Sequence, residues 1–404
     1  MLSDIGYALS KMRMDGLRVM EELRQNAAWI KDWIVGLRRE FHQYPELAFC
    51  EHRTTQRIIS ELENMNVPYR KLNPTGVVGE IHGKQRGNTI VLRADMDALP
   101  INEETELPFQ SVHSGIMHAC GHDANTAMLL GAARILQAKR DKLCGNVRLV
   151  FQPAEETAKG AKKVIEQGVL DDAACAFAVH VNAGAPVGEV RSVSGAMFAA
   201  SVRFEVTLVG KKCHAAFPHL GVDPVLAGCA VVQNLQSLNA REINSLHPFV
   251  LTIGSFQSDG THNVLSERAI LGGTIRTFNR EARKEIREAF YRIVESTATA
   301  YRCTTEIQYD ELTDVLINDS KLIEMSTQAV KKDLPQLNMV LGETFMGSED
   351  FAEFTARVPC AYFTIGAKGG FPSHHSKFEI DEEALYLGAC LYTSLATNAS
   401  QQKC

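Results

Sequence analysis

The sequence lacks an excess of charge of either sign, and it lacks any long hydrophobic run. Its 404 residues include 42 Lys and Arg against 48 Asp and Glu, which gives a formal net charge of −6. Because no segment is rich in Lys and Arg, the sequence gives no sign of the positively charged surface that binds nucleic acid. No apolar stretch reaches the roughly 20 residues that a membrane helix needs. We therefore expect neither a nucleic-acid partner nor a membrane partner.

Paired cysteine motifs and a secretion signal are also missing. Ten cysteines are spread along the chain, no CxxC occurs, and the first 20 residues carry charges every few positions. A signal peptide would instead show an apolar core followed by a cleavage site. In a long chain this pattern indicates reduced thiols rather than a disulfide framework. We expect a cytoplasmic protein in which most cysteines are small buried apolar residues.

What the chain does contain is a globular composition, with 45% hydrophobic and 22% charged residues. Residues 1–65 have mainly helical periodicity, and strand and helix patterns alternate after them up to about residue 197. The apolar runs at 77–82 and 88–94, with a short polar link between them, predict a hairpin. The alternation as a whole predicts an α/β domain with helices on both faces of a mostly parallel sheet.

The alternation of strand and helix patterns stops near residue 200 and resumes after residue 308. Between these points the patterns follow the order β-α-β-β-α-β, which is the split βαβ order of a small two-layer sandwich. A strand at 359–367 and a helix at 381–397 then resume the α/β pattern. We therefore predict a discontinuous catalytic domain over 1–197 and 309–404, interrupted by a ferredoxin-like α+β domain over 198–308.

Two short motifs contain residue types that bind metals. Cys120 and His122 stand two positions apart in HACGHD, and a thiolate beside an imidazole suits a borderline-soft divalent ion. Glu155 and Glu156 follow a predicted strand, where two buried carboxylates would repel each other unless a cation lay near them. Each motif also has an ordinary explanation, namely a buried cysteine beside a helix cap and solvated acids that begin a helix.

Further polar residues lie at other strand ends and loop starts. His180 closes a predicted strand, His375 lies in a late loop, and Asp95 and Asp97 follow a third strand. Each of them alone fits a structural role equally well. Together with the two motifs they could hold two metal ions, with a water between them and one carboxylate left as a base.

These motifs occur in an order that is specific to one family. The sequence resembles the metal-dependent amidohydrolases that include bacterial aminoacylases, hippurate hydrolase and plant auxin–amino acid conjugate hydrolases. The resemblance covers nearly the whole chain, from REFHQYPELAF to DEEALYLGA, through LRADMDALPI, HACGHD, FQPAEE, HAAFPH, NVLSERAILGGTIRTF and GSEDFAEF.

The resemblance implies a dinuclear centre with two divalent metal ions per subunit. The implied metals are zinc or manganese, with cobalt and nickel as other candidates. Glu155 would be the general base, and Cys120 would be the bridging thiolate. The implied ligand set is Cys120, His122, Glu156, His180 and His375.

The resemblance also assigns roles to the inserted domain. It implies a lid and dimerisation domain, so we expect a homodimer or a higher homo-oligomer. His214 would reach the partner subunit's site and stabilise the oxyanion, whereas Asn263 and Arg276 would hold the substrate carboxylate. An arginine fork matches a carboxylate bidentately. Packing of His214 beside Pro218, or pairing of Arg276 with a neighbouring acid, would explain these residues without a substrate.

The chain departs from the family pattern at three places. Asn125 stands where relatives often carry a histidine, Asn182 and Ala183 stand where an apolar residue and a proline are common, and Lys377 stands where many relatives have proline. None of these changes removes a predicted ligand or the base. We therefore predict a hydrolase that cleaves the amide bond of small-molecule N-acyl or N-aroyl amino acids. The alternatives are a dipeptidase or aminopeptidase on the same scaffold, and a catalytically inactive homologue.

Overall fold

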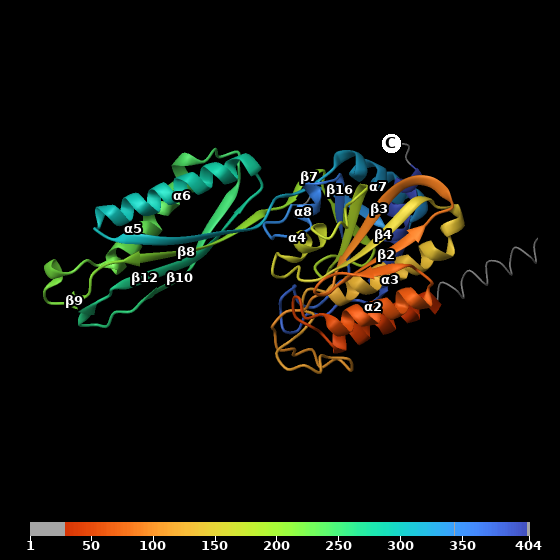
Figure 1. The fold of residues 1–404 in the computed structure, drawn as a ribbon, viewed down its shortest axis with the longest axis horizontal. Helices are drawn as coiled ribbons and strands as arrows, with labels where there is room; N and C mark the ends of the chain where they lie inside the picture. Colours follow the sequence, from red (N-terminus) through yellow and green to blue (C-terminus); the bar gives the residue numbers. More distant parts are fainter. Residues whose placement is uncertain (1–28, 343, 402–404) are drawn as a thin grey trace, which may run out of the picture. The chain divides into compact units, whose positions relative to one another are not determined.

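The computed structural model describes residues 29–342 and 344–401 (Figure 1). The helical pattern predicted over residues 1–28 lies outside the described residues. Two compact units are present. The first draws on residues 29–192, 321–340 and 358–401, and the second on residues 193–320 and 341–357. The insertion predicted over 198–308 lies within the second unit, and its role as a lid stays a prediction.

The first unit is built on an eight-stranded sheet. Four adjacent strands of this sheet, β4, β3, β5 and β16, run parallel to one another. Their middle residues are buried apolar side chains, as expected for strands covered on both faces. The prediction of an α/β fold with a mostly parallel sheet is confirmed. The strands in spatial order are β1 (Tyr69–Lys71), β2 (Val77–His82), β4 (Cys144–Gln152), β3 (Gln85–Asp95), β5 (Ala173–Asn182), β16 (Cys360–Gly366), β6 (Glu189–Ser192) and β15 (Asn338–Leu341).

The predicted hairpin at 77–94 is wrong. β2 pairs antiparallel with β4, and β3 pairs parallel with both β4 and β5, so β4 lies between the two strands of the supposed hairpin. Gly145 makes this insertion feasible, because its φ is +70° and a Cβ there would lie 2.0 Å from the carbonyl oxygen of Asn88. Only glycine fits such a backbone conformation and such a close approach.

The helices of the first unit surround the central strands. Helix α3 is buried along most of its length and packs against both α9 and β3. It begins directly after Gly121, whose φ of +93° and whose distance of 2.4 Å from a built Cβ to Val181 Cγ2 both require glycine. This turn fixes where Cys120 and His122 point. The helices are residues 29–43, α2 (His52–Asn64), α3 (His122–Ala138), α4 (Gly160–Ile165), α7 (Ser320–Asp333) and α9 (Glu383–Gln401).

The second unit has a four-stranded antiparallel sheet in the order β10-β12-β8-β13. Helices α5 and α6 lie along one side of this sheet (Figure 1), and the two layers share a core of buried apolar side chains. The chain order is the predicted β-α-β-β-α-β. The elements are β8 (Ala200–Val209), α5 (Pro224–Ser237), β10 (Phe249–Ser258), β12 (Arg268–Thr277), α6 (Arg280–Ala300) and β13 (Thr304–Thr313).

Smaller elements complete the second unit. The two short strands β9 and β11 form a ladder of their own, as do β7 and β14. These elements are β7 (Gly195–Phe198), β9 (Cys213–His214), β11 (Val264–Leu265), β14 (Leu316–Asn318), α8 (Ala352–Thr355), two short helical turns at Pro218–Leu220 and Leu238–Glu242 and, in the first unit, one at Arg140–Lys142.

Two general features bear on the sequence-based expectations. The nine cysteines of the described ranges are all free thiols, and only three of them are buried, so the expectation that most are buried is wrong. Among the residues placed in the structure, no helix combines the length and the apolar character needed to cross a membrane.

Candidate metal centre

Four of the five predicted metal ligands, together with the predicted base, meet at one edge of the sheet of the first unit. The carboxyl ends of parallel strands point to the same edge, which is where α/β folds place their ligands. Glu155 and Glu156 follow the end of β4, His180 lies near the end of β5, and His122 begins α3. Cys120 lies in the loop just before that helix.

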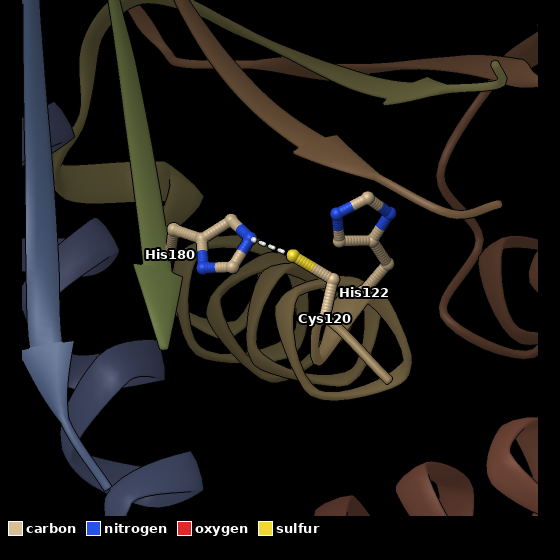
Figure 2. Close-up of side chains that lie close together, drawn as sticks. All are labelled: Cys120, His122 and His180. Atoms are coloured by element: carbon tan, nitrogen blue, oxygen red, sulfur yellow. Dashed lines mark hydrogen bonds between the residues drawn. The ribbon is translucent and has the colours of Figure 1, made fainter. Parts of the chain in front are cut away.

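The side chains of Cys120, His122 and His180 converge on one another (Figure 2). The Sγ atom of Cys120 lies 3.7 Å from Nε2 of His180. Nε2 of His122 lies 3.8 Å from Oε1 of Glu156 and 4.0 Å from Oε2 of Glu155. Two ligands of one tetrahedral zinc ion lie about 3.3 to 3.8 Å apart, given metal–ligand bonds of about 2.0 to 2.3 Å. The spacing therefore suits divalent ions.

The same region contains buried polar atoms without a hydrogen-bond partner. Among the described residues, Nε2 of His122 and Oε1 of Glu156 are two such atoms. Buried polar atoms are nearly always satisfied, and an unsatisfied one costs about 1 to 3 kcal/mol. Both atoms face the cluster and both are metal-ligand atoms, so the residues present fit a metal-binding role.

The electrostatics of the cluster also fit a bound cation. Burial raises the pKa of the Cys120 thiol, and the carboxylate of Glu156 raises it further. Burial raises the pKa of Glu156 to about 7; His122 opposes this rise, whereas Asp97 and Asp95 add to it. When no cation lies among them, the Cys120 thiol therefore keeps its proton at neutral pH, and Glu156 is only partly ionised there. A divalent ion reverses this balance and deprotonates a coordinating thiol.

Asp97 orients His122 and the two glutamates through hydrogen bonds on the side away from the cluster. Nδ1 of His122 lies 2.9 Å from the backbone oxygen of Asp97, so a proton on Nδ1 leaves the lone pair of Nε2 facing the cluster. The carboxylate of Asp97 accepts from the backbone N–H groups of Glu155 and Glu156, each at 3.0 Å. Burial acts to raise the pKa of Asp95, but the nearby His122, Arg93 and His180 and the hydrogen bond from Asn125 lower it overall.

Asn125 has a defined place in this arrangement. Its side-chain amide donates to Asp95 Oδ1 at 2.7 Å, and its Oδ1 accepts from the backbone N–H of Val181 at 3.0 Å. It therefore links Asp95 to the strand end that carries His180. At this position, where the chain departs from the family pattern, the side chain is buried and both its nitrogen and its oxygen form a hydrogen bond.

The structure brings His374 to the cluster, and not the predicted ligand His375. Nε2 of His374 lies 3.6 Å from Oε1 of Glu156, and the backbone N–H of His374 donates to the oxygen of Ala119 at 2.7 Å. Within the described ranges, His374 and not His375 joins a group of ligand atoms that lie within 4.8 Å of one another. The ring of His375 instead stacks on Phe371, and its Nδ1 accepts from the backbone of Lys377. The assignment at this position is corrected to His374.

The three remaining predicted residues lie in the second unit. His214 on β9 pairs with Val264 on β11, and the backbone N–H of Ala215 donates to the oxygen of Asn263. His214 and Asn263 are therefore held close together by this small ladder. His214 is exposed, and its Nδ1 accepts from the backbone N–H of Ala216 at 3.1 Å.

Arg276 lies on β12 and is half-buried. Within the described part of the chain no carboxylate pairs with it, and burial lowers its pKa. The explanation that a neighbouring acid neutralises this arginine therefore has no support among the described residues. A half-buried guanidinium without an acid partner suits an anionic ligand.

Comparison with known proteins places the chain among peptidases and amidohydrolases. The family model described as Peptidase family M20/M25/M40 matches residues 91–398. Thermostable carboxypeptidase 1 of Saccharolobus solfataricus is 35% identical over 395 residues, which cover 95% of this chain and 100% of that protein. N-acetylcysteine deacetylase of Bacillus subtilis is 38% identical, with 90% of this chain and 96% of that protein covered.

A solved structure supports the same comparison. The crystal structure of the Bacillus subtilis YXEP protein, described as a dinuclear metal-binding peptidase of family M20, superimposes with a TM-score of 0.83 at 34% identity. The match covers 93% of this chain and all of that one.

Proposed function

Because this chain belongs to peptidase family M20/M25/M40, we propose that it hydrolyses the amide bond of N-acyl or N-aroyl amino acids. The products are a carboxylic acid and a free amino acid. The observation that carries the proposal is the convergence of thiol, imidazole and carboxylate ligand atoms, with the second carboxylate of Glu155 beside His122 and Glu156. The relative named as an N-acetylcysteine deacetylase supports this substrate class.

We assign the metal ligands to Cys120, His122, Glu156, His180 and His374. When bound, two divalent ions would polarise the scissile carbonyl and lower the pKa of a water. The soft thiolate of Cys120 favours zinc, and manganese, cobalt and nickel are to be tested beside it. Asp97 keeps the ring of His122 in the tautomer that presents Nε2 to the metal.

Glu155 serves as the general base. Its carboxylate lies beside the ligand cluster, 4.0 Å from His122 Nε2, and its backbone is fixed by Asp97. From this position it accepts a proton from the attacking water and returns it to the nitrogen of the leaving amino acid. A positioned acid–base group of this kind contributes about 10²- to 10⁴-fold in rate.

The second unit supplies the substrate contacts. Arg276 binds the carboxylate of the amino-acid product half, and Asn263 contributes a further polar contact to it. His214 donates to the oxyanion that develops during attack, a type of contact that supplies much of the catalysis in acyl transfer. We propose that His214 acts in the site of a partner subunit within a homodimer or a higher homo-oligomer.

A peptidase activity on the same site is the second candidate. The relative named as a thermostable carboxypeptidase, which matches 95% of this chain, favours it. Both reactions need the same base and the same carboxylate contact. They differ in what precedes the scissile bond, which is an acyl group in one case and an aminoacyl group in the other.

An amine-release assay tests the proposal. The substrates are N-acetyl, N-lauroyl, N-benzoyl and indole-acetyl amino acids with zinc or manganese added, together with one dipeptide offered with a free and with a blocked amino terminus. We expect turnover of acyl amino acids, preference for the blocked dipeptide, loss of activity with a chelator and recovery with added metal. Preference for the free amino terminus would favour the peptidase, and full activity of metal-stripped protein would overturn the dinuclear site.

A further inference from the structure

The turn that carries Glu155 and Glu156 is held by buried carboxylates at three successive backbone N–H groups. Glu155 and Glu156 donate to Asp97, as described above. The preceding residue, Ala154, donates its N–H to Oε1 of Glu51 at 2.9 Å. Glu51 is 103 residues away in the sequence, and it lies at the N-terminus of α2.

This turn has a backbone conformation that needs support. Ala154 is fully buried and has φ of +58°, in the left-handed region. An L-residue other than glycine is disfavoured in this region, and such residues persist where the surrounding structure holds them in place. Pro153 directly before it has no N–H to offer. The hydrogen bond from Ala154 to Glu51 is therefore the first backbone contact after the end of β4 that fixes the direction of the turn.

Burying the carboxylate of Glu51 is energetically unfavourable unless it forms interactions that compensate for its desolvation. Its carboxylate is fully buried, and none of the ion pairs in the described residues includes it. It accepts from Thr75 Oγ1 at 2.5 Å and from the N–H of Ala154. Burial raises the pKa of Glu51 to about 7; the hydrogen bond from Thr75 opposes this rise and Asp97 adds to it. An apolar side chain would avoid the desolvation, but it could not accept the hydrogen bond from the N–H of Ala154, which Glu51 does.

We propose that Glu51 is a positioning residue for the general base: by fixing Ala154, it sets where the carboxylate of Glu155 lies. Glu51 contacts the turn and Thr75, whereas Glu155 faces the metal ligands. Misplacement of a catalytic group by about 1 Å can lower a rate on the order of 10²-fold. The catalytic part of this inference rests on the proposed function. The stabilisation of the turn by Glu51, however, can be measured without any catalytic activity.

Hydrogen exchange tests directly whether Glu51 stabilises the turn at Ala154. Glu51→Met keeps an unbranched side chain of similar length and removes the acceptor, so it avoids a large cavity. We expect amide exchange in peptides covering 153–157 to rise about tenfold, the effect of losing a hydrogen bond worth about 1.4 kcal/mol. Glu51→Gln keeps an acceptor oxygen and should exchange like the wild type. Unchanged exchange in Glu51→Met would overturn the proposal.

A matched control separates this effect from the general effect of losing a buried acid on α2. Glu61 lies on the same helix, is also buried, and pairs with Arg57. Glu61→Ala should leave exchange at 153–157 unchanged even if it lowers thermal stability. If Glu51→Met does not fold, Thr75→Val removes the second contact of Glu51 and should give a smaller rise in the same peptides. An equal rise in Glu61→Ala would show that the turn responds to any damage to α2, and this would also overturn the proposal.

Kinetics then connect the turn to the reaction. On whichever substrate the wild type cleaves, acyl amino acid or dipeptide, Glu51→Met should lower kcat on the order of 10- to 100-fold with KM and metal content unchanged. Glu51→Gln should have a kcat close to that of the wild type, because it keeps the acceptor oxygen. Lost metal, or an effect confined to KM, would contradict a role in placing Glu155. If the wild type cleaves neither substrate, the proposed function fails, while the exchange measurements still decide the role of Glu51 in the turn.

Discussion

Two adjacent glutamates have different surroundings and should respond differently to the same substitution. Glu156 has a buried oxygen that faces the ligand cluster, whereas Glu155 is the carboxylate that we assign as the base. Glu155→Gln should keep bound metal and lose about 10²- to 10⁴-fold in kcat. Glu156→Gln should lose metal. Elemental analysis beside initial rates measures both, and equal metal loss in the two variants would mean that the roles are wrongly assigned.

The neighbouring histidines His374 and His375 provide a second comparison. His374 lies at the cluster and His375 stacks on Phe371. We expect His374→Ala to lose metal and activity together, because a ligand atom is removed. His375→Ala should retain most of both. The reverse outcome, measured by metal content after gel filtration, would return the ligand assignment to His375.

At the residue scale, the motifs predict most of the centre and miss what depends on local backbone geometry. Cys120, His122, Glu156 and His180 come together as the resemblance implies. The choice between His374 and His375 could not be made from the sequence, because φ of +67° at His374 directs its side chain and either histidine satisfies the motif. Glu51 was missed because its contact with Ala154 joins distant segments.

At the scale of the elements, the start of α3 determines the geometry of two ligands. Gly121→Ala places a Cβ at a position 2.4 Å from Val181 Cγ2 and in a conformation with φ of +93°. We expect a loss of stability of about 2 kcal/mol or more and weaker metal binding, since Cys120 and His122 flank this residue. Denaturant unfolding and a metal titration measure the two effects. Gly115→Ala, at a positive-φ glycine with open space around it, is the control for backbone strain without a clash.

The element types were predictable, and the neighbour relations of some strands were not. Buried apolar runs identified β3, β4, β5 and β16 correctly because each of these strands is covered on both faces. The same patterns suggested a hairpin for β2 and β3, although β4 lies between them. Hydrophobic periodicity reports burial and contains no information on which strand is the partner, so a short polar link was taken for a turn between neighbours.

At the scale of the whole molecule, a site shared between subunits predicts complementation. His214→Ala and Glu155→Ala should each be nearly inactive, and His214→Ala should keep its metal because His214 belongs to the second unit. After subunit exchange, one site in each mixed dimer has both residues intact. Random pairing makes about half of the dimers mixed, so recovery approaches about 25% of wild-type activity. No recovery despite demonstrated exchange, or a fully active monomer, would show that His214 does not act in a partner's site.

The interrupted first unit has a consequence for the order in which the protein is made. Strand β16, which pairs with β5 beside His180, is translated only after the whole of residues 193–320. During translation the continuous part of the second unit can fold before β16 has been synthesised. Until then, the edge of β5 that pairs with β16 has no partner strand. Exposed strand edges recruit other chains, and nascent proteins meet this hazard during synthesis. A chain that stops before residue 358 would lack both β16 and His374, so premature termination there yields an aggregation-prone product rather than a weakly active enzyme.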